Sequence, residues 1–178
     1  MAVKIYKKLV SEKAKLGEQT NSYIVIHNSA GGTAKSVQEY FAKNAGPNPD
    51  RKDIYTHYTI DDKEGYQCLL DNWKGQHTSG NGYVAAWTDK QAPANNSNSI
   101  GIEVADGCIP NTYTMSGSVN LDLAIENCIE LVRYLMKAYS IPIQNVVRHG
   151  DTQKKECPYF IMKAGKWQYM LDEIKKRN

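Results

Sequence analysis

The stretch YIVI at residues 23–26, followed directly by His27, decides the fold. All four side chains are apolar and three are β-branched, which predicts a short strand that is buried on both faces. Such a strand lies inside a sheet that other elements cover on each side. Gly31 and Gly32 follow soon after and predict a flexible loop. A histidine therefore stands at the end of the expected central strand.

The other periodic segments predict an α/β domain around this strand. Alternating apolar residues predict further strands at residues 54–61, 66–70, 100–104 and 146–147. Helical spacing predicts helices at residues 33–46, with Val37, Tyr40 and Phe41 on one face, at 120–139, and at 167–176, with Trp167, Leu171 and Ile174 inward. This order of elements indicates a mixed central β-sheet flanked by helices.

Length and composition indicate a single domain over residues 1–178, because there is no repeat, low-complexity tract or linker. Residues 1–20 are polar and lysine-rich, and we expect them to form an extension packed across the surface of the domain. The net charge of +3 favours approach to an anionic surface such as a cell wall, but it is too small to predict nucleic-acid binding.

The chain shows no targeting or membrane segment by sequence. Residues 1–19 contain lysines but no apolar stretch of the length that a signal peptide needs, and no run approaches transmembrane length. We expect synthesis in the cytoplasm without membrane insertion, so that action elsewhere depends on another factor for release.

Three of the four cysteines are expected to be buried thiols. Cys128 lies on the apolar stripe of the long predicted helix, and Cys68 and Cys108 lie in or beside strand-like runs. The missing export signal and the adequate core argue against disulfides. Only Cys157 has neighbours that suggest chemistry.

His27, His149 and Cys157 form a candidate metal site. The two histidines each follow a β-rich run, so both are expected at one edge of a shared sheet, and Cys157 lies on a short loop that begins after His149. Two imidazoles and one thiolate are good zinc ligands, and three protein ligands leave one tetrahedral position open, as in hydrolytic zinc sites. The alternative is a set of ordinary polar residues at strand ends with satisfied hydrogen bonds.

Two charged residues near these positions each have two interpretations. Glu103 interrupts the apolar strand at residues 100–104, where a carboxylate is costly unless it has a task or a partner. It is either a functional carboxylate or an outward-facing one on a half-exposed strand. Lys155, two residues before Cys157, either faces a substrate oxygen or is one more solvated lysine.

These motifs together resemble the zinc-dependent N-acetylmuramoyl-L-alanine amidases of the amidase-2 family, which are related to phage amidase lysozymes and peptidoglycan recognition proteins. The matching segments occur in family order over about residues 20–175. They are YIVIHNS at 23–29, THYTID at 56–61, SIGIEV at 99–104, the long helix before IPI at 141–143, RH at 148–149 and KECP at 155–158.

The resemblance implies a role for each candidate residue. It makes His27, His149 and Cys157 the ligands of Zn²⁺, Glu103 the general base or water-orienting group, and Lys155 the cation that stabilises the tetrahedral intermediate. The implied substrate is peptidoglycan, cleaved at the amide between N-acetylmuramic acid and L-alanine.

The chain departs from the family pattern at one position. Amidase lysozymes often carry a tyrosine just before the histidine that matches His57, where this chain has Thr56. Tyr58 is a candidate for that assisting role, and His57 is expected to be a strand histidine with a structural hydrogen bond. In the loop that follows, Trp73 is a candidate for stacking on substrate or for packing, and His77 for lining the substrate groove or for a plain loop position.

The resemblance further implies a monomeric phage or prophage endolysin that is made in the host cytoplasm and reaches the wall through a holin. Three alternatives remain at this stage. One is a non-catalytic peptidoglycan-binding module, although such relatives usually lack the cysteine ligand. The others are a cytoplasmic amidase that recycles muropeptides and a regulator that contacts a phage RNA polymerase.

Overall fold

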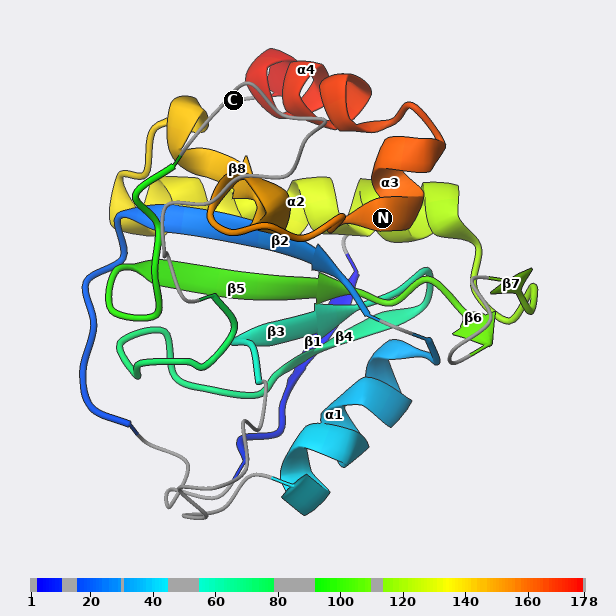
Figure 1. Ribbon diagram of the computed structural model, residues 1–178, viewed down its shortest axis with the longest axis horizontal. Coiled ribbons are helices and arrows are strands. Elements are labelled where there is room, and N and C mark those ends of the chain that lie inside the picture. The colour runs from blue at the N-terminus through cyan, green and yellow to red at the C-terminus, as the bar shows by residue number, and fades with distance from the viewer. Residues whose placement is uncertain are drawn as a thin grey trace.

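The structure is a computed structural model that describes residues 3–10, 16–29, 31–44, 55–78, 92–109 and 114–177. At its centre lies a six-stranded sheet with the strand order β1-β4-β3-β5-β2-β8 (Figure 1). The strands are β1 (Lys4–Lys7), β2 (Tyr23–Asn28), β3 (Tyr58–Ile60), β4 (Glu64–Gln67), β5 (Ser99–Val104) and β8 (Val146–Arg148). β3 and β4 pair antiparallel, and the other neighbours pair parallel. The mixed sheet that the sequence predicts is confirmed.

Helices lie on both faces of this sheet (Figure 1). They are α1 (Ala34–Asn44), α2 (Leu121–Tyr139), α3 (Tyr159–Lys163) and α4 (Trp167–Arg177), with 3₁₀ turns η2 (Ile143–Asn145) and η3 (His149–Asp151). A separate two-stranded ribbon is formed by β6 (Cys108–Ile109) and β7 (Thr114–Met115). α2 packs against β3 and β5, and α4 packs against α2. α1 packs against β3 and β4.

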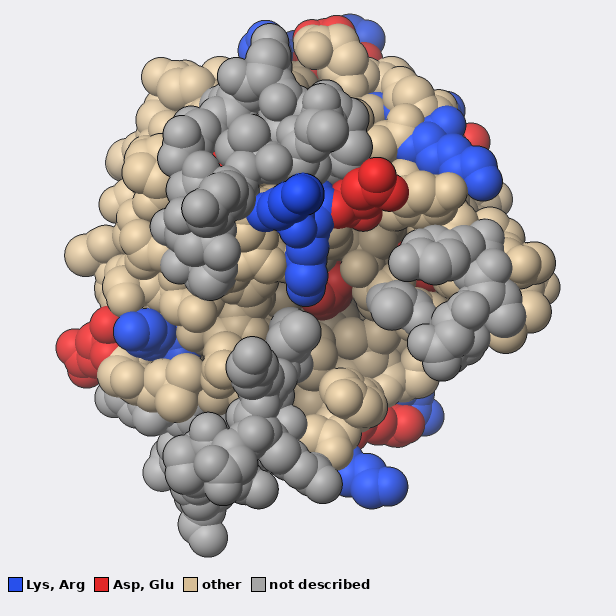
Figure 2. Space-filling model, viewed as in Figure 1, with Lys and Arg blue, Asp and Glu red and all other residues tan. Residues whose placement is uncertain are grey.

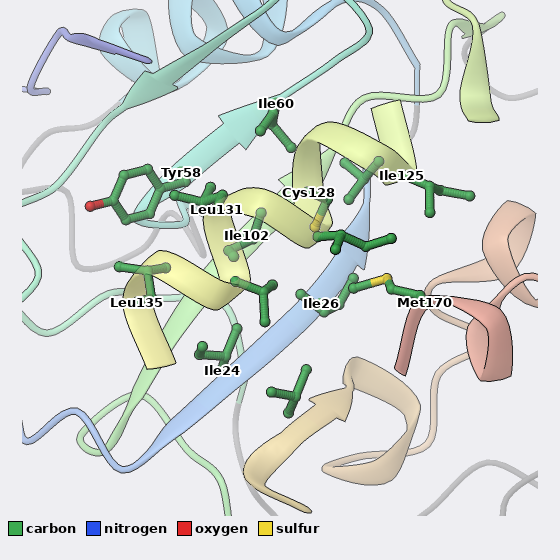
Figure 3. Packing of buried hydrophobic residues seen from close by; sticks show 14 of the residues in the cluster. Ile24, Ile26, Tyr58, Ile60, Ile102, Ile125, Cys128, Leu131, Leu135 and Met170 are labelled. Carbon is green, nitrogen blue, oxygen red and sulfur yellow. The ribbon is translucent and has the colours of Figure 1, made fainter. Parts of the chain in front are cut away.

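The YIVI stretch forms the buried strand β2, between β5 and β8. Ile24 and Ile26 point into the main core beneath α2 (Figure 3). Val25 belongs to the other face, where it packs with Ala92, Ala94 and Val147. Alternate side chains of β2 therefore belong to opposite layers. By this alternation, His27 belongs to the face of Val25, away from α2.

α2 matches its predicted boundaries because both of its ends are well specified. Asn120 is the N-cap, and its side chain accepts a hydrogen bond from the N–H of Leu123 at 3.2 Å. Ser140 ends the helix in a left-handed conformation, with φ of 55°. The apolar stripe of α2 is buried against the sheet, at Ala124, Ile125, Cys128, Ile129, Leu131, Val132, Leu135 and Met136.

Three sequence-based expectations need correction. Residues 4–7 form the edge strand β1, paired with β4, and do not merely lie across the surface. The strand expected at 54–61 is only three residues long, because His57 bonds to Gly101 through backbone and ring rather than through a regular ladder. On α1, Tyr40 is exposed and Gln38 is buried in its place, where its amide donates to the carbonyl of Lys8.

The described helices include none with the length and the hydropathy needed to cross a membrane.

Candidate metal centre

The structure brings the donor atoms of His27, His149 and Cys157 within 4.8 Å of one another. His27 is near the carboxyl end of β2, and His149 follows β8, the parallel neighbour of β2. Ile26 pairs with Arg148 in this register, so the two histidines come next to each other at the same sheet edge. Their ring centroids are 4.2 Å apart. Residues that are 122 positions apart in the chain thus meet because two parallel strands end together.

A buried ion pair fixes the turn that carries His149. The guanidinium of Arg148 donates to both carboxylate oxygens of Asp151, at 2.8 to 3.1 Å, and the N–H of Arg148 also donates to this carboxylate. Thr152 closes the turn by donating its hydroxyl to the carbonyl of His149 at 2.8 Å. A bidentate contact of this kind holds its partners in one geometry. The imidazole of His149 therefore projects from a rigid 3₁₀ turn.

Asn28, the last residue of β2, fixes the loop that carries Cys157. Its side-chain oxygen accepts the N–H groups of Phe160 and Ile161, at 2.9 and 3.3 Å, at the start of α3. Its own backbone N–H bonds to the Cys157 thiol. The carbonyl of Cys157 accepts the N–H of Gly150 at 2.8 Å. Asn28, next to His27, is thus bonded to the Cys157 loop, and the Cys157 loop is bonded to the turn that carries His149.

The chemistry of the cluster fits a metal ion of the zinc type. Among the described residues, Nε2 of His149 is buried and has no hydrogen-bond partner, which is costly unless the nitrogen has a ligand. Burial lowers the pKa of His149 to about 3 and the pKa of His27 well below its usual value, so both rings are neutral, the form that binds metals. Two imidazoles and one sulfur suit a tetrahedral Zn²⁺ with one open position.

The sulfur of Cys157 must lose its proton before it can bind a cation. Burial, followed by the nearby charge of Glu103, raises the pKa of the Cys157 thiol to about 12 in the metal-free protein. Metal binding at this cluster therefore releases a proton and weakens as the pH falls.

Glu103 lies beside this cluster on the same face of the sheet. It is opposite His27 in the β2–β5 register and opposite Thr59 in the β3–β5 register, and only 7 % of it is exposed. Within the described part of the chain, its Oε2 atom has no hydrogen-bond partner. Burial, and secondly the charge of Asp106, raises the pKa of Glu103 to about 8. The interpretation of Glu103 as an outward, half-exposed carboxylate is therefore wrong.

Lys155 is an exposed cation whose charge reaches this cluster. Burial is the largest cause of the lowered pKa of His149, and the charge of Lys155 is the second. The same charge opposes the increase in the pKa of Glu103. Figure 2 shows a hollow near the middle of this face, with basic side chains at its rim and an acidic one deeper inside. The structure thus places the exposed ammonium of Lys155 close enough for its charge to act on His27, His149 and Cys157.

Asp106 is a neighbour of Glu103 that the sequence analysis missed. One of its oxygens accepts the N–H of Cys108 at 2.8 Å, and the other is buried without a partner among the described residues. Burial raises the pKa of Asp106 to about 6. In the sequence it precedes a glycine, which is the ordinary pattern of a turn, so nothing in the pattern marked it.

Tyr58 and Trp73 do not reach the cluster. Tyr58 pairs with Ile102 in the β3–β5 register, so its ring lies on the α2 side of the sheet (Figure 3), and its hydroxyl donates to Asp71 at 2.7 Å. Trp73 is buried in a second apolar cluster with Phe41 and other residues next to α1, which supports its packing interpretation.

His57 and His77 are both buried behind the cluster. The Nε2–H of His57 donates to the carbonyl of Trp73 at 2.8 Å, and its Nδ1 accepts the N–H of Gly101 at 3.1 Å. These are the structural hydrogen bonds expected of His57. His77 is 4 % exposed, and its Nδ1 lies 3.1 Å from Nε2 of His27, so it is not a plain loop residue.

The buried His57 makes the folded protein sensitive to acid. Burial lowers the pKa of His57 to about 4, against about 6.5 in an unfolded chain. The unfolded state therefore binds a proton that the folded state excludes, so this stabilisation is complete above pH 6.5 and is lost as the pH falls towards 4. From pH 7 to 4.5, we predict that the free energy of unfolding of the metal-free protein falls by about 2 to 3 kcal/mol more in the wild type than in His57→Gln.

Urea unfolding of both proteins in chelator, at the two pH values, measures this difference. Glutamine keeps a donor towards the Trp73 carbonyl but does not titrate. Equal losses in the two proteins would show that His57 is not a source of the acid sensitivity.

Comparison with known proteins places this geometry in a family. Residues 17–160 match the family model described as N-acetylmuramoyl-L-alanine amidase, Amidase_2. The chain is 30 % identical to the N-acetylmuramoyl-L-alanine amidase CwlA of Bacillus subtilis over 94 % of this chain and 55 % of CwlA. The chain spans about half the length of the curated relatives it matches.

Two solved structures from Bacillus subtilis share the fold over almost their whole length. The catalytic domain of XlyA, from Bacillus subtilis, has a TM-score of 0.74 at 28 % identity and covers 97 % of this chain, which covers 99 % of that domain. A mutant endolysin from Bacillus subtilis gives the same TM-score of 0.74, identity of 28 % and coverage of 97 % and 99 %. The matching sequence model, the shared fold and the converging His-His-Cys donors establish that this chain belongs to the amidase-2 family of N-acetylmuramoyl-L-alanine amidases.

Proposed function

We propose that this chain hydrolyses the amide bond between N-acetylmuramic acid and L-alanine in bacterial peptidoglycan, with one Zn²⁺ held by His27, His149 and Cys157. The observation that carries the proposal is the convergence of the three donor atoms within 4.8 Å, next to a buried carboxylate of which one oxygen has no hydrogen-bond partner among the residues that the structure describes. A peptidoglycan-binding module has no need for these groups, because a buried imidazole nitrogen and a buried carboxylate without hydrogen-bond partners are costly unless they have a function.

When bound, zinc polarises the scissile carbonyl and lowers the pKa of a water molecule. Glu103 accepts a proton from the attacking water and returns it to the leaving amine. Burial raises its pKa to about 8 in the metal-free protein, and the charge of a bound divalent cation would lower the pKa towards the ambient pH, where a group that both takes and gives a proton works best. The position of Glu103 opposite His27 puts its side chain on the same face as the cluster, and its charge acts on the Cys157 thiol.

Lys155 stabilises the oxygen that becomes negatively charged when the carbonyl is attacked. Its ammonium is exposed, yet its charge acts on His27, His149 and Glu103, so it reaches the same volume as the donor atoms. An ammonium on a flexible stem can approach a developing oxyanion without first being buried.

The biological setting that we propose is lysis of a bacterial host by a phage or prophage endolysin. The support is the shared fold with the Bacillus subtilis endolysin and with the XlyA catalytic domain. Release from the host cytoplasm by a holin belongs to this proposal.

Digestion of purified cell walls tests the activity. We predict that the protein releases soluble fragments with new N-terminal alanine and without new reducing sugar ends, because an amidase cuts the peptide from the glycan. Chelator should abolish the release and added zinc should restore it. Binding to walls without release would identify a recognition module, and new reducing ends would identify a glycosidase; either result would overturn the proposal.

A further inference from the structure

His77 is buried behind the metal cluster and makes contacts that no role in substrate binding explains. Its Nδ1 lies 3.1 Å from Nε2 of His27, and its Nε2 lies 3.2 Å from the carbonyl oxygen of Ser99. The rings of His27 and His77 meet edge to face, with centroids 5.2 Å apart. His77 thus contacts the His27 ring at its Nε2 atom.

The hydrogen-bond chain allows only one arrangement of protons. A carbonyl oxygen accepts and never donates, so Nε2 of His77 carries the hydrogen towards Ser99. The hydroxyl of Ser99 also lies 3.4 Å from this nitrogen, but its hydrogen goes to the carbonyl of Asn95 at 2.6 Å. The hydroxyl therefore cannot donate to His77, and both contacts require Nε2–H.

This proton arrangement extends to His27. A neutral imidazole has one donor nitrogen and one acceptor nitrogen, so Nδ1 of His77 carries a lone pair. That lone pair accepts the hydrogen on Nε2 of His27. Nδ1 of His27 is then the nitrogen with a free lone pair.

The structure is built to hold the His77 ring in this place. The side-chain oxygen of Asn96 accepts the N–H groups of both His77 and Thr78, each at 2.8 Å. The His77 ring packs directly against the backbone of Gly101. A side chain at this position would clash with the ring, since a Cβ would lie only 2.7 Å from Nδ1 of His77. Gly75 likewise leaves room, since a Cβ there would lie 3.0 Å from the His77 ring.

We propose that His77 is a positioning residue that holds His27 in the Nε2–H tautomer and so presents its Nδ1 lone pair to the metal ion. The inference rests on the proposed role of His27 as a zinc ligand. Partners that orient a ligating imidazole typically change metal affinity by about 10- to 100-fold when they are lost. His77 therefore acts through His27 and not on the substrate.

Two amide substitutions separate the acceptor from the donor of His77. In His77→Asn, the amide oxygen takes the place of Nδ1 and can still accept from His27. In His77→Gln, the amide nitrogen takes the place of Nε2 and can donate to Ser99, but nothing accepts from His27. We expect the zinc affinity, measured by competition with a chromophoric chelator, to fall about 10- to 100-fold in His77→Gln and to stay close to wild type in His77→Asn.

The tautomer itself is measured on the metal-free wild type. Long-range ¹H–¹⁵N correlation of the four histidine rings should show a hydrogen on Nε2 of His27. Gly101→Ala provides a variant in which all ligands and His77 are kept, but the added Cβ displaces the His77 ring. Its zinc affinity should fall as in His77→Gln, and Nε2 of His27 should lose its fixed hydrogen.

Equal zinc affinities in His77→Asn and His77→Gln, whether both unchanged or both reduced, would overturn the proposal, as would a hydrogen on Nδ1 of His27 in the wild type. If His77→Gln does not fold, the Gly101→Ala affinity and the wild-type tautomer decide. All these readouts use zinc alone, so a protein that binds zinc as expected but leaves cell walls intact would disprove the proposed amidase activity and not this inference.

Discussion

Replacing Cys157 with serine is expected to remove the bound zinc and the amidase activity together. A serine hydroxyl has nearly the same size as the thiol, but it does not ionise at neutral pH, and a neutral oxygen is a poor substitute for a thiolate towards Zn²⁺. We expect zinc affinity to fall by more than the factor of about 100 that a lost supporting contact can cost. Hydrolysis of cell walls should fall at least about 100-fold, since carbonyl polarisation is lost with the metal. Metal analysis and wall digestion on the same preparation measure both effects.

Cys108→Ser is the matched control for this experiment. Cys108 is likewise a free cysteine, but it lies in β6 and its sulfur bonds to the carbonyl of Ile109. The same chemical change there should leave zinc content and turnover unchanged. A Cys157→Ser protein with full zinc content and full turnover would show that Cys157 is not a ligand.

The layout of the fold could be predicted from the sequence because its strongest signals are local. The stretch at residues 23–26 is apolar at every position, and α2 repeats its apolar stripe over five turns between two clear caps. Both signals are local patterns of apolar residues, which can be recognised without knowledge of the tertiary contacts. The edge strand β1 shows no such signal, because only one side of it is paired and its side chains are mostly exposed.

The three donor residues were readable from the sequence because they occupy strand ends and belong to a family motif. Their supports were not. Asn28 bonds to Cys157 and to the start of α3, which lie about 130 residues further along the chain. The side chain of Asn96 bonds to the backbone of His77. Such contacts depend on tertiary packing, which periodicity does not encode. His77 shows this most clearly, because its place in a loop indicated either a groove-lining or a plain loop residue, while a glycine in a distant strand makes room for its buried ring.

Replacing Glu103 with glutamine is expected to abolish turnover while the zinc remains bound. The amide has the same shape but cannot take a proton from water, and losing a general base typically costs about 100- to 10,000-fold in rate. The three donor atoms are untouched, so zinc content should equal that of the wild type. Folding should not suffer. In the metal-free protein burial raises the pKa of Glu103 to about 8, which means that the ionised form opposes folding of that protein and that a neutral amide relieves this cost at higher pH.

Glu156→Gln is the control that shows whether the loss of any carboxylate near the cluster is enough to change the activity. Glu156 is an exposed carboxylate immediately before Cys157, so this variant makes the same chemical change close to the cluster. It should keep both zinc and activity. Zinc content, the melting temperature and the release of N-terminal alanine are compared in the three proteins. If Glu103→Gln kept more than about a tenth of the wild-type rate, proton transfer by Glu103 would be excluded, because even a weakly contributing base exceeds that effect.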